Sequence, residues 1–400
     1  MKFIKIFDKG WINLKKIYVD NASTAFPKAP SVGDTMKHFL DNVGCNLGRG
    51  GYESAYHVAL EVLQTKKLLC ELFNFNQPRN VIFTPGLTYS INMILQGFLQ
   101  AGDHLITSSM EHNAVMRPLH ALSKRGVTYS VAQCQPDGTL VASEVAKLIN
   151  HNTKAIAITH ASNVCGTILP LEEIAQICHS HKLKLIVDTA QTAGLLNLDM
   201  SQIDALAFTC HKGLLAASGL GGFIVKSEFA SQINPIITGG TGSASHEFNQ
   251  PSLLPDKFEV GTLNIPAIMG LKASLEYLKS TGIATIFKQT KELTERFIAE
   301  ISKIDDIDII GKQKTDNRVA IVSLNFKNQD NAEIASLLDS KYQIMTRCGL
   351  HCAPNAHKTL GTYPSGTIRF SFSHFNTPSE ITTIVDAVKD ILNKGETYGF

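Results

Sequence analysis

Short apolar runs recur along the chain, and most of them end in small or polar residues. Residues 205–208 read ALAF and are followed at once by TCHK. Further predicted strands occupy 81–83, 104–110, 154–160 and 183–187. A short apolar run bounded by turn residues is typical of a buried strand, whereas residues 54–75 repeat apolar positions at helical spacing. Alternation of such strands with helices predicts an α/β fold built on a doubly wound, mainly parallel sheet.

The chain is longer than one ordinary hydrophobic core can organise. Its 400 residues lead us to expect two domains. We predict an N-terminal extension over 1–17, a large domain over 18–264 and a smaller α+β domain over 265–400. Apolar residues make up 44% of the chain and charged residues 18%, which is the composition of a globular protein rather than a disordered one. The extension lacks the apolar core and cleavage site of a signal peptide.

Charge and cysteine content exclude several classes of protein. The net charge is +2 and the basic residues are dispersed, so nothing favours binding to nucleic acid. The eight cysteines are scattered, which indicates a reducing compartment rather than a disulfide scaffold. No apolar run approaches the ~18 residues of a membrane-spanning helix. We therefore expect a cytoplasmic protein that binds neither nucleic acid nor membrane.

The polar group after the run at 205–208 contains a lysine with unusual surroundings. Lys212 follows a predicted buried strand and precedes small residues as far as Gly222, which places it in a crevice. Burial lowers the pKa of a lysine, and the neutral amine forms Schiff bases with carbonyl cofactors. Most lysines are nevertheless solvated, so Lys212 alone decides nothing. Asp188, however, ends the preceding predicted strand, and a carboxylate there can keep the ring nitrogen of pyridoxal phosphate (PLP) protonated.

Two motifs around these residues carry a resemblance to a known family. Asp188-x-x-Gln191 followed by Thr209-x-His211-Lys212 resembles the class-V aminotransferases, whose best-known members are the cysteine desulfurases. The resemblance extends from the first predicted strand to the C-terminus. It implies PLP as the cofactor, bound through Lys212 with Asp188 facing its ring nitrogen. It also implies PLP-dependent fold type I, with a seven-stranded sheet in the large domain, and a homodimer with sites at the interface.

A strand-to-helix junction upstream predicts an anion site. Residues 81–88 read VIFTPGLT, which gives a strand, a glycine turn and the start of a helix. Free N–H groups at a helix N-terminus attract anions. The junction matches the Gly-x-Thr phosphate turn of the family, with Tyr89 where the family usually has an acidic residue. The resemblance implies this set of phosphate ligands: Gly86, Thr88, Thr209, His211 and, contributed in trans by the second subunit, Thr262.

Three further polar residues follow predicted strands or strand ends. His112 can stack on the pyridine ring of the cofactor and transfer protons, or it can be an ordinary capping residue. Its match to the Glu-His-x-x-Val block of the family favours the stacked, catalytic position. The resemblance likewise implies that Asn163 and Gln191 hydrogen-bond the ring oxygen of the cofactor.

A second reactive group is predicted near the C-terminus. Residues 347–354 read RCGLHCAP, which places Cys352 just past a strand and near Arg347. A thiolate is a nucleophile, and a nearby cation lowers the pKa of a thiol. Such a cysteine can also be buried and inert, or Cys348, His351 and Cys352 can bind a metal, although no fourth ligand has a suitable spacing. The match to the desulfurase motif Arg-x-Gly-x-His-Cys-Ala implies that Cys352 accepts sulfur on a short, tethered loop, with Cys348 a bystander and no metal.

Three arginines are candidate ligands of the substrate. Arg369 lies on a predicted strand, where an arginine needs a partner, and a carboxylate matches its paired donors. The family uses an arginine at this position for the amino-acid carboxylate, and the resemblance places Arg347 and Asn163 nearby. Arg49, in a glycine-rich loop, matches a family arginine near the substrate pocket, or it is simply solvated.

Taken together, the resemblance implies PLP-dependent conversion of L-cysteine to L-alanine. Lys212 would move the Cα proton, Cys352 would carry the sulfur as a persulfide, and an acceptor protein would receive it, as in iron–sulfur cluster assembly. Three alternatives stay open: a selenocysteine lyase, another class-V aminotransferase or β-lyase, and a PLP-free sulfur-relay scaffold. The intact Asp188, Gln191 and Lys212 argue against the scaffold.

Overall fold

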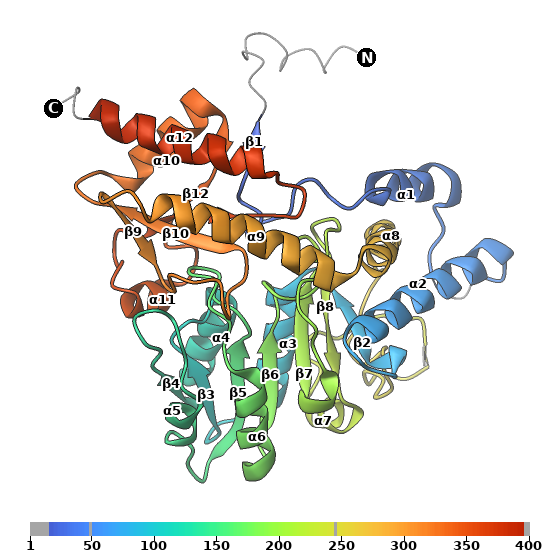
Figure 1. The fold of residues 1–400 in the computed structure, drawn as a ribbon. Helices are drawn as coiled ribbons and strands as arrows, with labels where there is room; N and C mark the ends of the chain where they lie inside the picture. Colours follow the sequence, from blue (N-terminus) through green and yellow to red (C-terminus); the bar gives the residue numbers. More distant parts are fainter. Residues whose placement is uncertain (1–15, 48–49, 244–245, 396–400) are drawn as a thin grey trace.

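A seven-stranded sheet and a four-stranded sheet organise this computed structural model, which describes residues 16–47, 50–243 and 246–395 (Figure 1). The larger sheet has the strand order β2-β8-β7-β6-β5-β3-β4. Its strands are β2 (Val81–Thr84), β3 (His104–Ser108), β4 (Thr128–Ala132), β5 (Thr153–Thr159), β6 (Lys184–Asp188), β7 (Ala205–Thr209) and β8 (Gly221–Val225). All neighbours pair in parallel except β8, which is antiparallel to both β2 and β7. The predicted α/β class with a mainly parallel seven-stranded sheet is confirmed.

Both faces of the large sheet are covered, which explains why the middle of each central strand is apolar. Ile186 packs into one hydrophobic core with the helices α3 (Leu87–Phe98) and α4 (Asn113–Ser123). Val187, the next residue along β6, packs into the core on the opposite face. Successive side chains of a strand point to opposite faces, so a doubly covered sheet needs apolar residues throughout.

The second core is built by helices from several parts of the chain. These helices are α2 (Glu53–Leu72), α5 (Ala142–Ala146), α6 (Leu171–His181) and α8 (Ile265–Thr281). The other helical segments of this half are α1 (Val32–His38), η1 (Phe39–Val43), η2 (Pro78–Asn80), η3 (Met200–Gln202) and α7 (Ser227–Gln232). The helix α8 packs against α1 and α2, so the first helix beyond residue 264 is part of the core of the large sheet.

The smaller sheet is antiparallel and has its own core. Its order is β12 (Arg347–Gly349), β13 (Thr367–Ser371), β10 (Ile321–Phe326) and β9 (Ile307–Ile310). The helices of this core are α9 (Ile283–Ile301), α10 (Asn331–Tyr342) and α12 (Pro378–Gly395), whereas α11 (Pro354–Thr359) packs into the core of the large sheet. A separate pair joins β1 (Ile17–Tyr18) to β11 (Ile344–Met345) in parallel. Ile17 and Val19 are therefore buried in the core of the smaller sheet. The domain limits expected from the sequence remain a prediction.

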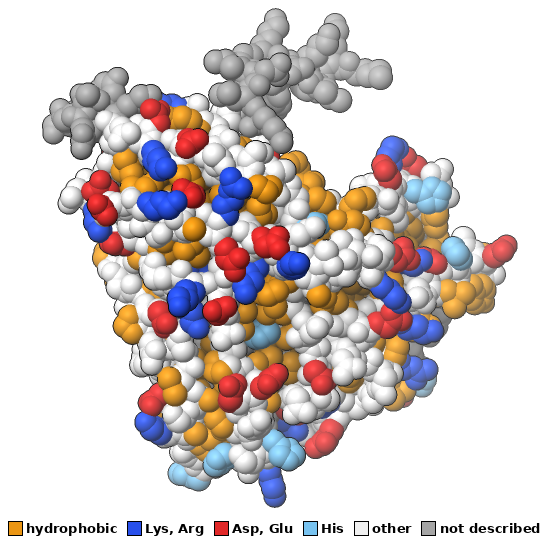
Figure 2. All heavy atoms as spheres, in the orientation of Figure 1, with side chains coloured by type: hydrophobic (Ala, Val, Ile, Leu, Met, Phe, Trp, Pro, Cys, Tyr) orange, Lys and Arg blue, Asp and Glu red, His pale blue; other side chains and the backbone are white. Residues whose placement is uncertain are grey.

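Acidic and basic side chains are interspersed on the face drawn in Figure 2, which has no large patch of one charge. Among the described residues, no helix is both long enough and apolar enough to cross a membrane.

Candidate active site

The carboxyl ends of the parallel strands open into one cavity of about 350 Å³. In a doubly wound sheet, ligands bind outside these strand ends. The smaller sheet closes the cavity from the other side. The cavity brings together most of the residues predicted from the sequence: Gly86, Thr88, His112, Asn163, Asp188, Gln191, Thr209, His211, Lys212, Arg347 and Arg369.

Lys212 and Asp188 both line this cavity, and the pKa values of both are shifted. The pKa of Lys212 is lowered to about 8, mainly by desolvation; the charges of Arg369 and Arg347 act in the same direction, while Asp188 opposes the shift. Asp188 is buried at the end of β6, and burial raises its pKa. The Ala190 N–H counteracts this by donating to Asp188 Oδ1 at 2.8 Å. The cavity is therefore lined by a lysine amine that loses its proton easily and by a carboxylate whose position is fixed by a backbone hydrogen bond.

The turn that carries Lys212 is fixed by close backbone packing. Leu215 N donates to Lys212 O at 2.8 Å, which closes the turn after β7. A Cβ on Gly213 would lie 2.4 Å from the carbonyl oxygen of Ala193, so no larger residue fits there. The lysine is thus positioned against the segment that follows Asp188 rather than on a free loop.

The opposite end of the cavity is suited to an anion. Gly86 is the N-cap of α3, and no side chain caps this helix, so its first N–H groups are free for a ligand beside the exposed Thr88. A Cβ on Gly221 would lie 2.8 Å from Gly86 Cα, so β8 packs directly against the turn. His211 Nδ1 is buried without a partner among the described residues, and burial lowers the pKa of His211 to about 4. The unpartnered Nδ1 of His211 and the uncapped N-terminus of α3 line the same cavity, and both could hydrogen-bond a phosphate group.

His112 caps a helix and also lines the cavity. Its Nδ1 accepts a hydrogen bond from Ala114 N at 3.0 Å and so caps α4, while the ring lines the cavity. Because Nδ1 accepts, the proton of the neutral ring is on Nε2. Burial lowers the pKa of His112 to about 4, and the charge of Lys212 acts in the same direction. The ring is therefore neutral at pH 7.

The loop of Cys352 is tied down at its backbone. His351 and Cys352 both have positive φ, 47° and 58°, which is a costly conformation for residues with a side chain. Asn113 N donates to Cys352 O at 2.8 Å, and Asn163 Nδ2 donates to His351 O at 2.8 Å. The Cys352 side chain is exposed, and His351 rather than Cys352 lines the cavity. The loop is thus anchored beside the cavity with its thiol accessible from outside.

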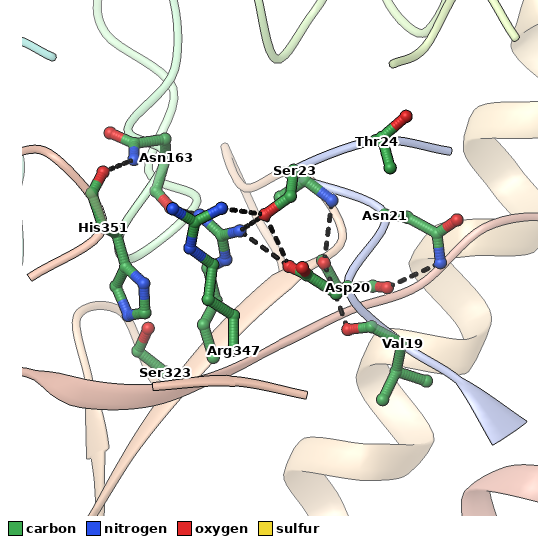
Figure 3. A network of polar contacts seen from close by, with 12 residues as sticks. Val19, Asp20, Asn21, Ser23, Thr24, Asn163, Ser323, Arg347 and His351 are labelled. Atoms are coloured by element: carbon green, nitrogen blue, oxygen red, sulfur yellow. Dashed lines mark hydrogen bonds and ion pairs between the residues drawn. The ribbon is translucent and has the colours of Figure 1, made fainter. Parts of the chain in front are cut away.

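Two arginines converge at the end of the cavity formed by the smaller sheet. Arg369 Nη2 and Arg347 Nη1 both donate to Ser23 Oγ, at 2.7 and 2.6 Å. Arg369 also forms an ion pair with Asp20 at 2.9 Å. Figure 3 shows Asp20, Ser23 and Arg347 pointing toward one another, with Asn163 beside them. A basic pocket for a carboxylate is the chemistry expected of this arrangement.

Similarity to known proteins places the chain in a family. A model of the family "Aminotransferase class-V" matches residues 17–384. The chain belongs to the class-V aminotransferases. A probable cysteine desulfurase of Methanothermobacter thermautotrophicus is 30% identical over 386 residues, which cover 95% of this chain and 95% of that protein. A cysteine desulfurase of Shigella sonnei is 29% identical and covers 94% of this chain and 93% of that protein.

Solved structures of cysteine desulfurases have a similar fold. The apo structure of a cysteine desulfurase from Thermococcus onnurineus NA1 matches with a TM-score of 0.89 at 26% identity, over 94% of this chain and 95% of that one. A cysteine desulfurase from Escherichia coli matches with a TM-score of 0.85, also at 26% identity and over the same shares of the two chains. The family predicted from the sequence motifs is therefore confirmed.

Some predicted class-V residues are not brought to the cavity. Thr262 lines two other cavities and not the one that contains Lys212. Arg49 lies outside the described residues. Cys348, on β12, is half-buried, and burial raises the pKa of its thiol. No group of three or more potential metal ligands occurs within 16–47, 50–243 and 246–395.

Two carboxylates that contact residues of the cavity were not singled out in the sequence. Asp20 forms an ion pair with Arg369. Its position just after the strand at 17–18 is the sequence feature that could have marked it as a candidate site residue. Glu111 is fully buried, and its Oε1 accepts from Ser108 Oγ at 2.5 Å and from Thr159 N at 3.0 Å. Burial raises the pKa of Glu111 to about 8. Glu111 could have been identified from the sequence because it directly precedes His112.

Proposed function

We propose that the chain is a PLP-dependent cysteine desulfurase that converts L-cysteine to L-alanine. The observation that carries the proposal is that Lys212, Asp188 and two arginines line one cavity, with the anchored Cys352 loop at its edge. Relatives that are named cysteine desulfurases support the same activity. The exposed thiol favours a desulfurase over a class-V aminotransferase, which would not need Cys352.

The residues of the cavity fit PLP at both of its charged ends. Lys212 would hold the aldehyde carbon, and Asp188 would face the ring nitrogen, as its burial and single backbone hydrogen bond allow. The α3 N-terminus, Thr88, Thr209 and His211 would hold the phosphate. When bound, PLP supplies an electron sink for a carbanion at Cα of the amino acid. His112 would cover the ring and exclude water from it.

Lys212 and Cys352 would then share the chemistry. Lys212 Nζ, with its pKa lowered to about 8, would remove the Cα proton of the bound cysteine and return it. The Cys352 thiolate would attack the substrate sulfur and form an S–S bond while the Cβ–S bond breaks. The electron pair of that bond stays on carbon and is protonated, which yields alanine and a Cys352 persulfide. The acceptor that removes the sulfur would meet Cys352 at the surface, where its side chain is exposed.

A product assay tests this proposal. The purified protein, loaded with PLP and supplied with a thiol reductant, should release alanine and sulfide in equal amounts from L-cysteine. Turnover of L-selenocysteine, measured in parallel as selenide, separates the desulfurase from a selenocysteine lyase. Formation of pyruvate and ammonia in place of alanine would instead indicate a β-lyase, and the proposal would be abandoned.

We further propose a homodimer, because α2 exposes an apolar stripe. Tyr56 is 64% exposed and Leu60 63% exposed on this helix, with Tyr52 and Leu63 alongside. Contiguous exposed apolar residues of this kind mark interaction surfaces. A cavity between α2 and residues 240–263 contains both Leu63 and Thr262. A second copy that covers α2 would therefore come within reach of Thr262, which supports its action in trans.

Replacing Leu60 by aspartate should convert the dimer into monomers. Burying a new carboxylate in an apolar interface costs several kcal/mol, enough to shift a dimer equilibrium by at least about a hundredfold. Light scattering after size-exclusion chromatography measures the change in mass. Val141→Asp is the matched control, because Val141 is an exposed apolar residue outside α2. Equal masses for the two variants would rule out α2 as the interface.

A further inference from the structure

One buried ion pair lies beside the segment that carries Thr262. Lys66 Nζ, on α2, lies 2.7 Å from Glu259 Oε1, and the two side chains are 6% and 8% exposed. Removing two charges from water is costly, and the best-attested use of a buried ion pair is to select one arrangement of the chain. The arrangement selected here is that of the residues around Glu259.

Glu259 also contacts the outermost strand of the large sheet. β2 ends the strand order and pairs with β8, and Phe83 N donates to Glu259 Oε1 at 2.8 Å. Lys66 Nζ lies 5.3 Å from the centre of the Phe83 ring. The helix α2 and the strand β2 lie side by side (Figure 1). One carboxylate oxygen thus joins the helix, the edge strand and the segment that contains Glu259.

Thr262 follows this anchor by three residues. Thr262 is exposed, and it lines one cavity of about 750 Å³ together with Lys66 and Glu259. Gly261 N donates to Gly240 O at 2.8 Å, which fixes the backbone between the anchor and Thr262. The position of Thr262 therefore depends in part on the contacts that Glu259 makes with α2 and β2.

The same contacts bear on the anion end of the cavity that contains Lys212. β2 ends at Thr84, and Gly86 and Thr88 of the anion end follow directly. Glu259 therefore contacts the strand that leads to the anion site of its own subunit, and it also anchors the segment that would reach the second subunit.

We propose that the Lys66–Glu259 ion pair positions Thr262 to bind the cofactor phosphate of the second subunit. The inference rests on the proposed function, because it assumes PLP and a homodimer. Neither Lys66 nor Glu259 lines the cavity of Lys212, so both are positioning residues that act through Thr262. A hydroxyl that is already held in place loses less conformational freedom on binding than a mobile one, so the ion pair strengthens phosphate binding.

Binding of PLP and of pyridoxal to the full-length apoprotein tests this role. Pyridoxal has the same aldehyde and ring but no phosphate, so the ratio of the two Kd values, measured by visible absorbance, isolates the phosphate contacts. Lys66→Met/Glu259→Ala removes the ion pair without leaving an unpaired buried charge. The preference for PLP over pyridoxal should fall about tenfold, the value of one hydrogen bond to a charged group, while the Kd for pyridoxal stays native.

Two results with this variant would overturn the proposal. One is a native preference for PLP, and the other is equal weakening of both ligands, because the ion pair would then only stabilise the fold. If the double variant does not fold, Glu259→Gln provides the same comparison, since the amide can still accept from Phe83 N but cannot form the ion pair. An unchanged preference in Glu259→Gln would contradict the proposal as well.

Two controls locate the effect. Lys272 and Glu61 form an ion pair of 2.6 Å between α8 and α2, and neither lines the cavity that contains Thr262. Lys272→Met/Glu61→Ala should keep the native preference, and an equal loss there would refute a specific role of the Lys66–Glu259 pair. Adding Lys66→Met/Glu259→Ala to Thr262→Val should cause no further loss. A further tenfold loss would show that the pair acts through β2 and not through Thr262.

Failure of the proposed function would look different. If Thr262→Val kept the native preference for PLP, the contact in trans would be refuted together with its positioning by the ion pair. A native enzyme that favours PLP over pyridoxal but releases no alanine from cysteine would refute the desulfurase activity alone.

Discussion

Replacement of Lys212 by alanine should remove both the covalently held cofactor and the activity. Lys212 is the amine that faces Asp188 in the cavity, and burial keeps its pKa near 8. Without it, no group remains at this position to hold the cofactor covalently or to move the Cα proton. Loss of a general base alone costs about a hundredfold to ten-thousandfold in rate. We expect alanine production to fall by at least that factor, and the visible absorption of the PLP-loaded protein to be lost on dialysis.

Lys28 offers a matched control for this variant. Burial lowers the pKa of Lys28 to about 8 as well, yet its Nζ donates to Thr24 Oγ1 and His211 O and does not line the cavity. Lys28→Ala should therefore retain visible absorption after dialysis. If Lys212→Ala retained it too, the assignment of the cofactor lysine would be wrong.

The pH dependence of cofactor capture follows from the same pKa. Only the neutral amine reacts with an aldehyde, and the pKa of Lys212 lies well below its ordinary value of 10.5. In the apoprotein, the rate of PLP incorporation should rise as pH increases through about 8 and then level off. Stopped-flow absorbance between pH 6 and about 10 would measure it.

Replacement of Cys352 by serine should separate cofactor binding from sulfur transfer. Cys352 is exposed at the edge of the cavity and does not line it. The variant should bind PLP with native absorption and fold normally. A hydroxyl is a far poorer nucleophile toward sulfur than a thiolate, so release of alanine and sulfide should fall by at least about a hundredfold.

Cys348→Ser is the control for Cys352→Ser. Cys348 lies on β12 opposite Ile368, and burial raises the pKa of its thiol, which disfavours the thiolate. This variant should retain nearly full turnover. Mass spectrometry of the native protein after a single turnover should detect one added sulfur on the peptide that contains Cys352. Full desulfuration by Cys352→Ser would eliminate the persulfide step.

Local sequence patterns were sufficient for the fold class and for the residues near strand ends. Residues 183–188 and 205–212 each combine an apolar run with a polar group, and burial on both sheet faces is enough to define such strands. Polar residues that follow neighbouring parallel strands meet at one sheet edge. Lys212 and Asp188 could therefore be placed together before the structure was known, and the family motifs specified the rest of the expected site.

Contacts between distant parts of the chain could not be predicted in this way. Asp20 and Arg369 are 349 positions apart, and the residues around Asp20 in the sequence do not indicate that it forms an ion pair. The same applies to Asn163, whose side-chain amide holds the loop of Cys352 through His351 O. The packing of α8 into the core of the large sheet also depends on the tertiary arrangement, because the apolar spacing of a helix does not reveal which sheet it covers. The predicted role of Thr262 depends on a second subunit and stays a prediction.

The pairing of β1 with β11 and of Asp20 with Arg369 bears on how the protein is made. The ribosome synthesises β1 well before its partners, because Ile17 pairs with Ile344 and Asp20 with Arg369. Domains generally form as units as they emerge. The sheet that carries Lys212 can therefore assemble on the nascent chain, whereas the arginine pocket can form only after Arg369 has been synthesised.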